Sequence, residues 1–401
     1  MPLANRINGY SEKDSAPRTD ERDRNENEAG RSAGVVVSLR GRLEHFTWAW
    51  FTATMSTGGL AVALAETPHR FRGLDTIGLT IFILNTTLFL LLCALMTTRL
   101  LLFPHRFKHS FHHPTESFFF GSFWLSIAVI LCGTQLYGVS PTRPWLIPAL
   151  RISYWIYATI SLLNAIQQYW LFMRRAPAKP VPMNPAWFLP GYSAMLTGTV
   201  ASIIAGSQPP EHRLPVIVSG CAFQGFGWLL SCIWIGMYVA RLMESGLPPP
   251  DVRPGMFIPV GTAAYTIVAL IGQARAIPPE HAYFAAHPGA AETLQTLALF
   301  VGVFLWLFSF WLFAVAVLAC VAGIPEMGFT LSWWAFVFPN VGFAVATVEI
   351  GRELGSQGVL WVGSGMTVGL VVVWLFTAGA CVRAVVKRRI LWPGRDEDKD
   401  M

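Results

Sequence analysis

Long apolar stretches alternate with short polar segments along most of the chain, and each stretch ends near proline, glycine or charge. Ten such stretches occur, at residues 46–65, 76–98, 118–136, 148–172, 187–206, 214–239, 256–273, 294–322, 329–348 and 359–382. A helix needs about 20 predominantly apolar residues to cross the hydrocarbon core of a bilayer. The pattern therefore predicts an all-α membrane protein with ten transmembrane helices and no sizeable soluble domain.

The charge distribution supports this fold class. Of the 401 residues, 13% are Asp, Glu, Lys or Arg, whereas about 25% are charged in an average soluble domain. Sixteen charged side chains lie within residues 1–44 and ten within 383–401. The segment between them has too few charges to cover a soluble surface, which excludes a soluble enzyme. We predict a disordered tail (1–40), a transmembrane domain (41–388) and a charged tail (389–401).

Basic residues flank the first and last apolar stretches. Arg40 and Arg42 precede the first, and Arg383, Lys387, Arg388 and Arg389 follow or end the last. Cytoplasmic flanks of transmembrane helices are enriched in Lys and Arg. Together with an even number of spans, this predicts that both termini are cytoplasmic. The same topology accounts for the net charge of +6 without a nucleic-acid partner.

A repeat relates the odd-numbered stretches. Residues 55–58 read Met-Ser-Thr-Gly and residues 195–198 read Met-Leu-Thr-Gly, while Pro190, Pro259 and Pro339 recur near the start of three odd stretches. A proline within a helix frees a backbone carbonyl and kinks the helix. Lipid cannot satisfy such a carbonyl, whereas a water-filled route can. We therefore expect the odd helices to surround a polar route and the even helices to lie outside.

Metal, cofactor and nucleotide sites are not predicted. The chain has no GxxxxGK[ST] motif, so ATP binding is not expected. Four histidines cluster at 105, 109, 112 and 113, but no acid or cysteine completes a metal site, and a basic membrane-surface stretch is the preferred interpretation. The six cysteines lie inside apolar stretches without a CxxC pair, and we expect buried, unpaired thiols.

Two motifs resemble a known family. The first is His-Phe-Thr-Trp-Ala-Trp-Phe at 45–51 with Met-Ser-Thr-Gly-Gly at 55–59, continued by Pro-His-Arg-Phe at 68–71. These residues resemble the opening of the fungal malic acid transport proteins. The second, Trp-Trp-Ala-Phe-Val-Phe-Pro at 333–339, is similar to a signature of plant slow-type anion channels. Both groups belong to the tellurite-resistance and dicarboxylate transporter superfamily, and the resemblance covers about residues 40–390.

The resemblance implies an architecture and a gate. It implies five helical hairpins in a quasi-fivefold arrangement around a central pore, and a homotrimer with one pore per subunit. It also implies that the phenylalanine directly before the ninth-helix proline, here Phe338, blocks the pore. A bulky aromatic side chain beside a kink can close a narrow tube by excluding water. The alternative is that Phe338 is one core aromatic residue among 28 phenylalanines.

An anion in a low-dielectric route requires hydrogen-bond donors or positive charge. Arginine suits a carboxylate because its planar guanidinium group donates two parallel hydrogen bonds. Arg275 follows the seventh stretch without a neighbouring basic run, and Gln273 can add an amide donor. Arg70, in the loop after the first stretch, is a second candidate. The alternative for Arg275 is an interfacial arginine that snorkels to the membrane surface.

Further candidates carry neutral or titratable donors. Thr57, Thr197 and Asn340 lie near the expected kinks, and each can instead bond a local carbonyl. His113 at the entrance to the third stretch can add positive charge to a cytoplasmic vestibule and make transport pH-sensitive. Glu116, beside it, is a candidate for proton coupling but is more typical of a first-turn residue favoured by the helix dipole.

Three charged residues close the ninth stretch. Glu349, Arg352 and Glu353 have i, i+3 and i+4 spacing, which indicates an ion-paired helix end rather than a selectivity element.

The sequence thus predicts a plasma-membrane permease, not an enzyme, for malate and related C4-dicarboxylates such as succinate and fumarate, with protons as a further possible substrate. The alternatives left open are a sulfite efflux pump, a passive chloride or nitrate channel, and, in a different class, a membrane-embedded enzyme. A membrane-embedded enzyme would need paired acids or metal motifs within its helices, and the sequence has neither.

Overall fold

The computed structural model describes residues 38–105, 110–111, 113, 116–174 and 183–392. Contacts divide the chain into two units, Met1–Arg42 and Leu43–Met401. Of the first unit, the described part comprises only residue 38 and the beginning of α2 (Leu39–Glu44). The predicted tails, 1–40 and 389–401, lie almost entirely outside the described residues. All that follows concerns the second unit.

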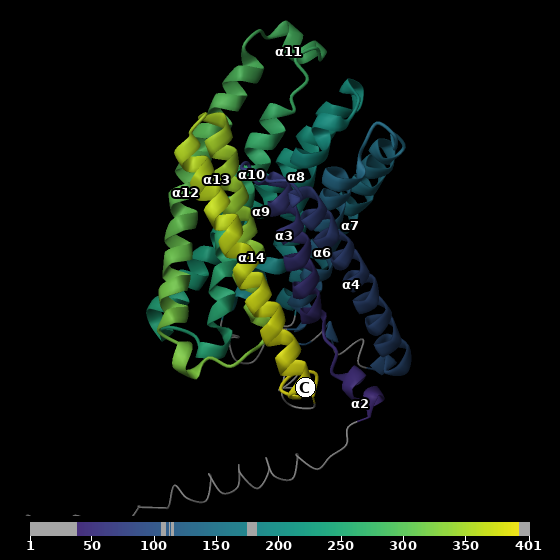
Figure 1. The fold of residues 1–401 in the computed structure, drawn as a ribbon, viewed down its shortest axis with the longest axis vertical. Helices are drawn as coiled ribbons and strands as arrows, with labels where there is room; N and C mark the ends of the chain where they lie inside the picture. Colours follow the sequence, from purple (N-terminus) through teal and green to yellow (C-terminus); the bar gives the residue numbers. More distant parts are fainter. Residues whose placement is uncertain (1–37, 106–109, 112, 114–115, 175–182, 393–401) are drawn as a thin grey trace, which may run out of the picture. The chain divides into compact units, whose positions relative to one another are not determined.

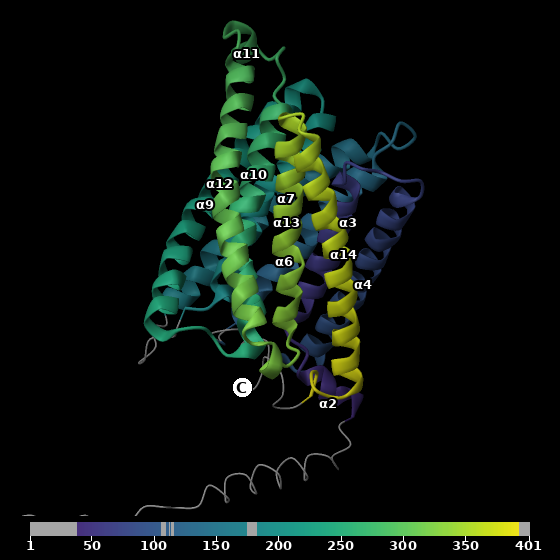
Figure 2. The same cartoon turned by 60° about the vertical axis from the view of Figure 1, so that its left-hand side comes forward.

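The second unit is built from five consecutive helical hairpins (Figures 1 and 2). The first helix of each hairpin is, in chain order, α3 (Phe51–Glu66), α6 (Glu116–Gly133), α8 (Leu189–Ile204), α10 (Ile258–Arg275) and α13 (Phe338–Glu353). The second helix of each is α4 (Leu74–Leu102), α7 (Leu146–Arg174), α9 (Pro210–Ser245), α12 (Ala290–Val321) and α14 (Gln357–Val386). A short helix, α11 (Ala282–Ala286), precedes α12, and a π-helical segment, η2 (Thr134–Gly138), extends α6. The described residues contain no strand, which confirms the all-α prediction.

The first helices of the hairpins form a closed ring. α3 contacts α6, α6 contacts α8, α8 contacts α10, α10 contacts α13, and α13 contacts α3. Burial follows the same division. In the most apolar 18 residues of the span that contains α8, 89% of the residues are buried, whereas 17% are buried in the corresponding part of α4. The outer helices expose large apolar side chains such as Phe300, Phe304 and Leu307 on α12, as expected of a lipid-facing surface. The prediction of an inner and an outer set of helices is thus confirmed.

Nine helical segments among the described residues are long and apolar enough to cross a membrane. They correspond to the second to tenth predicted stretches. The first predicted stretch forms η1 (Trp48–Trp50) and α3, and α3 alone has only 16 residues. The number of ten membrane crossings therefore remains a prediction. Below, the end of the bundle with the start of α3 and the end of α14 is called the tail side, and the opposite end the far side.

The recurring prolines mark a change of helix type. Each stands at the second residue of an α-helix and follows a 3-10 segment: η3 (Pro185–Phe188), η5 (Pro250–Phe257) or η7 (Leu331–Phe336). Proline is tolerated there, because the first turn of a helix has no acceptor for its N–H groups.

The carbonyls that two of these prolines leave free are already occupied. Leu189 N–H donates to Ala186 O, and Ile258 N–H donates to Gly255 O. The expectation that water must satisfy these carbonyls is wrong for Pro190 and Pro259, because the tighter 3-10 turn does so.

A fully buried ion pair joins the first two hairpins on the tail side. Arg99 Nη1 of α4 lies 3.1 Å from Glu116 Oε1 of α6, and the two side chains are 1% and 0% exposed. Ser110 Oγ donates to the same carboxylate oxygen at 2.6 Å, and Arg99 Nε donates to Glu44 O at 3.1 Å. Arg99 lies in the last turn of α4, and its partners enclose its side chain. Glu116 does occupy the first turn of α6.

We expect Arg99→Met to lower the free energy of unfolding by about 3–5 kcal/mol, because the carboxylate of Glu116 would stay buried without its cation. The double variant Arg99→Met/Glu116→Leu should recover part of this loss. Denaturant unfolding of the purified protein in detergent measures both. As the control, Arg70→Met breaks the exposed pair with Asp75 and should cost only about 0–1 kcal/mol. Equal losses at Arg99 and Arg70 would contradict the buried-pair account.

Candidate functional site

Two cavities of the described residues lie along the ring. Each is lined by residues from all five inner helices or from the short helical segments that adjoin them. The far-side cavity has a volume of about 150 Å³. It is lined by Val62, Glu66, Leu136, Thr199, Ser202, Ile203, Tyr265, Val268, Gly272, Arg275, Val341, Val345 and Glu349. The tail-side cavity has a volume of about 270 Å³ and is lined by the starts of the inner helices together with the end of α9 and the loop after it.

The two sets of lining residues continue one another along single helix faces. On α3, Thr52 and Met55 line the tail-side cavity, and Val62 and Glu66 line the far-side cavity. On η7 and α13, Ala335 lies on the tail side and Val341 on the far side. The four residues of α3 follow one another at spacings of three, seven and four, which keep them on one face of the helix. The two cavities therefore lie along the same axis, one on each side of the level of Gly59 and Phe338.

Aromatic rings fill the axis between the cavities. Phe338 is 0% exposed, and its ring centroid lies 5.2 Å from Tyr265 of α10 and 6.0 Å from Tyr192 of α8. Tyr265 Oη donates to Phe338 O at 3.0 Å, which ties α10 to the start of α13. Three side chains from three inner helices thus separate the two cavities.

Two glycines make room for these rings. A Cβ atom at Gly59 of α3 would lie 3.2 Å from the ring of Phe338, and one at Gly261 of α10 would lie 1.7 Å from Tyr192 Oη. The hydroxyl group of Tyr192 has no hydrogen-bond partner in the described part of the chain. A larger residue at Gly261 would displace this tyrosine, so glycine here is a packing requirement.

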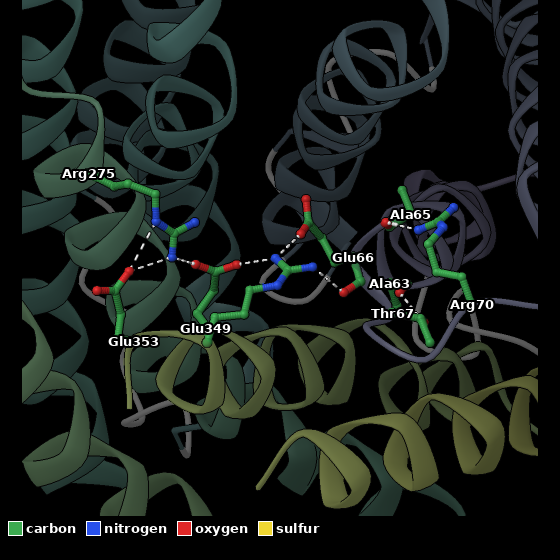
Figure 3. A network of polar contacts seen from close by, with 9 residues as sticks. Ala63, Ala65, Glu66, Thr67, Arg70, Arg275, Glu349 and Glu353 are labelled. Carbon is green, nitrogen blue, oxygen red and sulfur yellow. Dashed lines mark hydrogen bonds and ion pairs between the residues drawn. The ribbon is translucent and has the colours of Figure 1, made fainter. Parts of the chain in front are cut away.

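A chain of ion pairs spans the far side of the axis (Figure 3). Arg275 Nη2 lies 2.5 Å from Glu349 Oε2 and 2.7 Å from Glu353 Oε1. Arg352 Nη1 lies 2.6 Å from Glu349 Oε1 and 2.5 Å from Glu66 Oε2. The predicted ion-paired end of the ninth stretch is confirmed, and it extends to α10 and α3. The group has three carboxylates and two guanidinium groups, which gives a formal charge of −1.

Two of the sequence-predicted site residues lie on the axis. Phe338 lies between the cavities, and Arg275 lines the far-side cavity with its Nε and Nη2 atoms engaged by glutamates. Arg70 instead bonds Ala65 O and Asp75 in the loop after α3. His113 Nδ1 accepts a hydrogen bond from Glu116 N at the start of α6.

The other predicted residues form hydrogen bonds within the bundle. Gln273 Nε2 donates to Gly198 O of α8, and Thr57 Oγ1 accepts from Trp374 Nε1 of the outer helix α14. Thr197 Oγ1 lies 3.3 Å from Ser161 Oγ of α7. Asn340 Nδ2 donates to Phe336 O. It therefore makes the bond to a local carbonyl that was the alternative to a place on the route. Asn340 also lines a separate apolar cavity of about 450 Å³ between α12, α14 and the start of α13.

Several axial residues were not predicted from the sequence. Tyr192 and Tyr265 enclose Phe338, and Thr199 lines the far-side cavity with a buried hydroxyl group that has no hydrogen-bond partner among the described residues. Arg241 and Tyr238, near the end of α9, line the tail-side cavity. A signal for the inner residues of α8 is their spacing, because Tyr192 and Thr199 lie seven residues apart and therefore share one face of the helix. Arg241 has no such signal, because it belongs to an outer helix.

The cysteine prediction holds in part. None of the six cysteines forms a disulfide bond within the described residues, and Cys132, Cys320 and Cys381 are buried. Cys221 and Cys232 are exposed on the outer helix α9, so the expectation of burial is wrong for them; an apolar stretch on an outer helix has a lipid-facing side. Of the histidine cluster, His109 and His112 lie outside the described residues.

Comparisons with known proteins agree with this architecture. The family model described as voltage-dependent anion channel matches residues 45–382. The chain is 32% identical over 365 residues to a malic acid transport protein of Schizosaccharomyces pombe, which covers 90% of this chain and 83% of that protein.

Two further relatives are more distant. A sulfite efflux pump of Trichophyton rubrum is 26% identical over 339 residues, with 83% of this chain and 89% of that protein covered. An uncharacterized transporter of Methanocaldococcus jannaschii is 22% identical over 344 residues, with 84% and 94% covered. With a family match over most of its length and a closed ring of helices around two collinear cavities, this chain belongs to the voltage-dependent anion channel family.

Proposed function

We propose that this protein transports malate and related C4-dicarboxylates along the axis of the inner helical ring, with Phe338 as the gate. The observation that carries the proposal is the pair of collinear cavities separated by one aromatic cluster. An anion that enters either cavity meets Phe338 before it reaches the other. Membership of an anion channel family, and a relative named as a malic acid transport protein at 32% identity, support an organic anion as the substrate.

The proposal includes a setting for the protein. The chain would cross the plasma membrane with both termini in the cytoplasm and assemble as a homotrimer in which each subunit has its own route. The tail side then faces the cytoplasm and the far side faces out. Positive flanks at Arg383 and Lys387 support this orientation. Proton coupling belongs to the same proposal.

The substrate is tested by competition. In proteoliposomes with a pH gradient, malate and succinate should compete with each other for flux better than sulfite or chloride does. Among the alternatives to malate, sulfite has support from the comparisons, because a relative at 26% identity is named as a sulfite efflux pump. Preferred flux of sulfite would replace malate as the proposed substrate, and flux that ignores the pH gradient would remove proton coupling.

We expect Phe338→Ala to raise basal anion flux at least about tenfold, which corresponds to about 1.4 kcal/mol of barrier. The reason is that removal of the ring joins the two cavities. Phe336→Ala is the matched control, because Phe336 lines the separate apolar cavity and contacts Phe257 and Trp333 instead of the axis. Flux through both variants is measured in proteoliposomes at equal protein content. Unchanged flux through Phe338→Ala, or an equal rise in both variants, would argue against the gate.

We expect Arg275→Gln to raise the KM for malate uptake from the far side roughly tenfold to a hundredfold, since a charge-assisted hydrogen bond contributes about 1.5–3 kcal/mol. The substitution also leaves an extra negative charge at the far side. Arg275→Gln/Glu353→Gln restores the formal charge and separates the two effects. If Arg275 contacts the substrate, the double variant stays defective. Recovery of uptake in the double variant would show that Arg275 only neutralises its glutamates.

A further inference from the structure

An arginine without a hydrogen-bond partner among the described residues lines the tail-side cavity. Arg241, near the end of α9, lines this cavity, and its Nε atom is enclosed without a hydrogen-bond partner among the described residues. Two other arginines on this side are engaged: Arg99 pairs with Glu116, and Arg253 donates to Pro248 O and Ala319 O. Because buried donors are nearly always satisfied in folded proteins, the enclosed Nε of Arg241 indicates an absent acceptor.

A second donor without a partner faces the same cavity. Tyr238 precedes Arg241 by three residues, so the two lie on one face of α9. The side chain of Tyr238 is 4% exposed, and its hydroxyl group has no partner in the described part of the chain. Asn184, at the start of η3, also lines the cavity. Its Oδ1 accepts from Ala186 N at 2.9 Å, which directs the amide NH₂ group away from that bond.

The remaining lining offers nothing to compensate the charge. Among the described residues that line the cavity, no carboxylate occurs. The hydroxyl groups of Thr52 and Ser332 already donate to Ala49 O and Asp251 O. The side chain of Asp251 accepts from Gly328 N in the neighbouring loop. An uncompensated guanidinium group in an apolar cavity attracts an anion, because charge in a low-dielectric site is costly to leave unpaired.

The chemistry favours a carboxylate. The planar guanidinium group can donate two parallel hydrogen bonds to the two oxygens of a carboxylate, and a tyrosine hydroxyl group can donate a third. The volume of about 270 Å³ approaches the range of about 300–1,000 Å³ that is typical of small-molecule sites. A C4-dicarboxylate is a small ligand on this scale.

We propose that Arg241 and Tyr238 form a binding subsite for one carboxylate of a small organic anion in the tail-side cavity. The subsite holds the anion on the axis before it reaches Phe338. The inference rests on the proposed function, because it takes the axis as the route of transport. It assigns the tail side a different means of attracting anions from the far side, where the guanidinium groups of Arg275 and Arg352 are engaged by glutamates.

The experiment measures binding, separately from transport. Malate is titrated into the purified full-length protein in detergent, and the rise in the thermal unfolding midpoint gives its affinity. Arg241→Gln should weaken malate binding roughly tenfold or more, because a charge-assisted pair is lost. Tyr238→Phe should weaken it by a smaller factor and leave the midpoint without malate unchanged, since its hydroxyl group bonds no atom of the described residues. This second variant keeps the test valid if Arg241→Gln does not fold.

Arg174→Gln is the matched control. It removes one positive charge at the end of α7, on the same side of the bundle, from an exposed residue stacked over Trp170. Its malate affinity should equal that of the unaltered protein. If Arg241→Gln and Tyr238→Phe also bind malate with unaltered affinity, the subsite is overturned while malate transport can stand. If malate binding depends on Arg241 but reconstituted protein moves no malate, the subsite stands and the proposed function fails.

Discussion

The packing of α13 against α3 closes the ring, and every feature of the axis depends on this contact. Hydrogen bonds and an ion pair join these two segments, which are far apart in sequence. Ser56 Oγ donates to Trp334 O near the tail side, and Arg352 bonds Glu66 at the far side. Between them the ring of Phe338 lies against Gly59. Lipid offers no hydrogen-bond partners, so the inner helices must satisfy their polar groups within the bundle. A ring closed in this way encloses an axis that only side chains can fill.

Much of the architecture could be predicted from the sequence, because it follows from the length and periodicity of apolar stretches. The division into inner and outer helices followed from the repeat around Pro190, Pro259 and Pro339. The direction in which individual side chains point could not be predicted in this way, since the rotation of each helix about its axis depends on packing. Thr57 is two residues from both Met55 and Gly59, and it bonds the outer Trp374 instead of lining the axis. Position near a proline was therefore a poor guide to which polar groups line the axis.

Partners across the fold could not be predicted either. Arg275 had no acidic neighbour in sequence, yet Glu349 and Glu353 engage it from 74 and 78 residues away. The partner of Arg99 is likewise on another helix, because Glu116 at the start of α6 pairs with it. Arg241 belongs to an outer helix, so the pattern of the inner helices does not indicate that it lines a cavity on the axis. In each case the deciding contact is a tertiary one, whereas the ion pair between Glu349 and Arg352 is local and was predicted from spacing.

The hydrogen bond from Tyr265 Oη to Phe338 O has a consequence for how a gate here would move. It anchors the backbone of Phe338, which Pro339 further restrains by its fixed φ angle. The mobile part is then a single ring turning about its own side-chain bonds, and the bundle around it need not change. Side-chain rotations are fast, at picoseconds to nanoseconds when unhindered, whereas helix movements take microseconds to milliseconds. The opening rate would then be set by how tightly two tyrosine rings confine one phenylalanine, which makes it a property of local packing density.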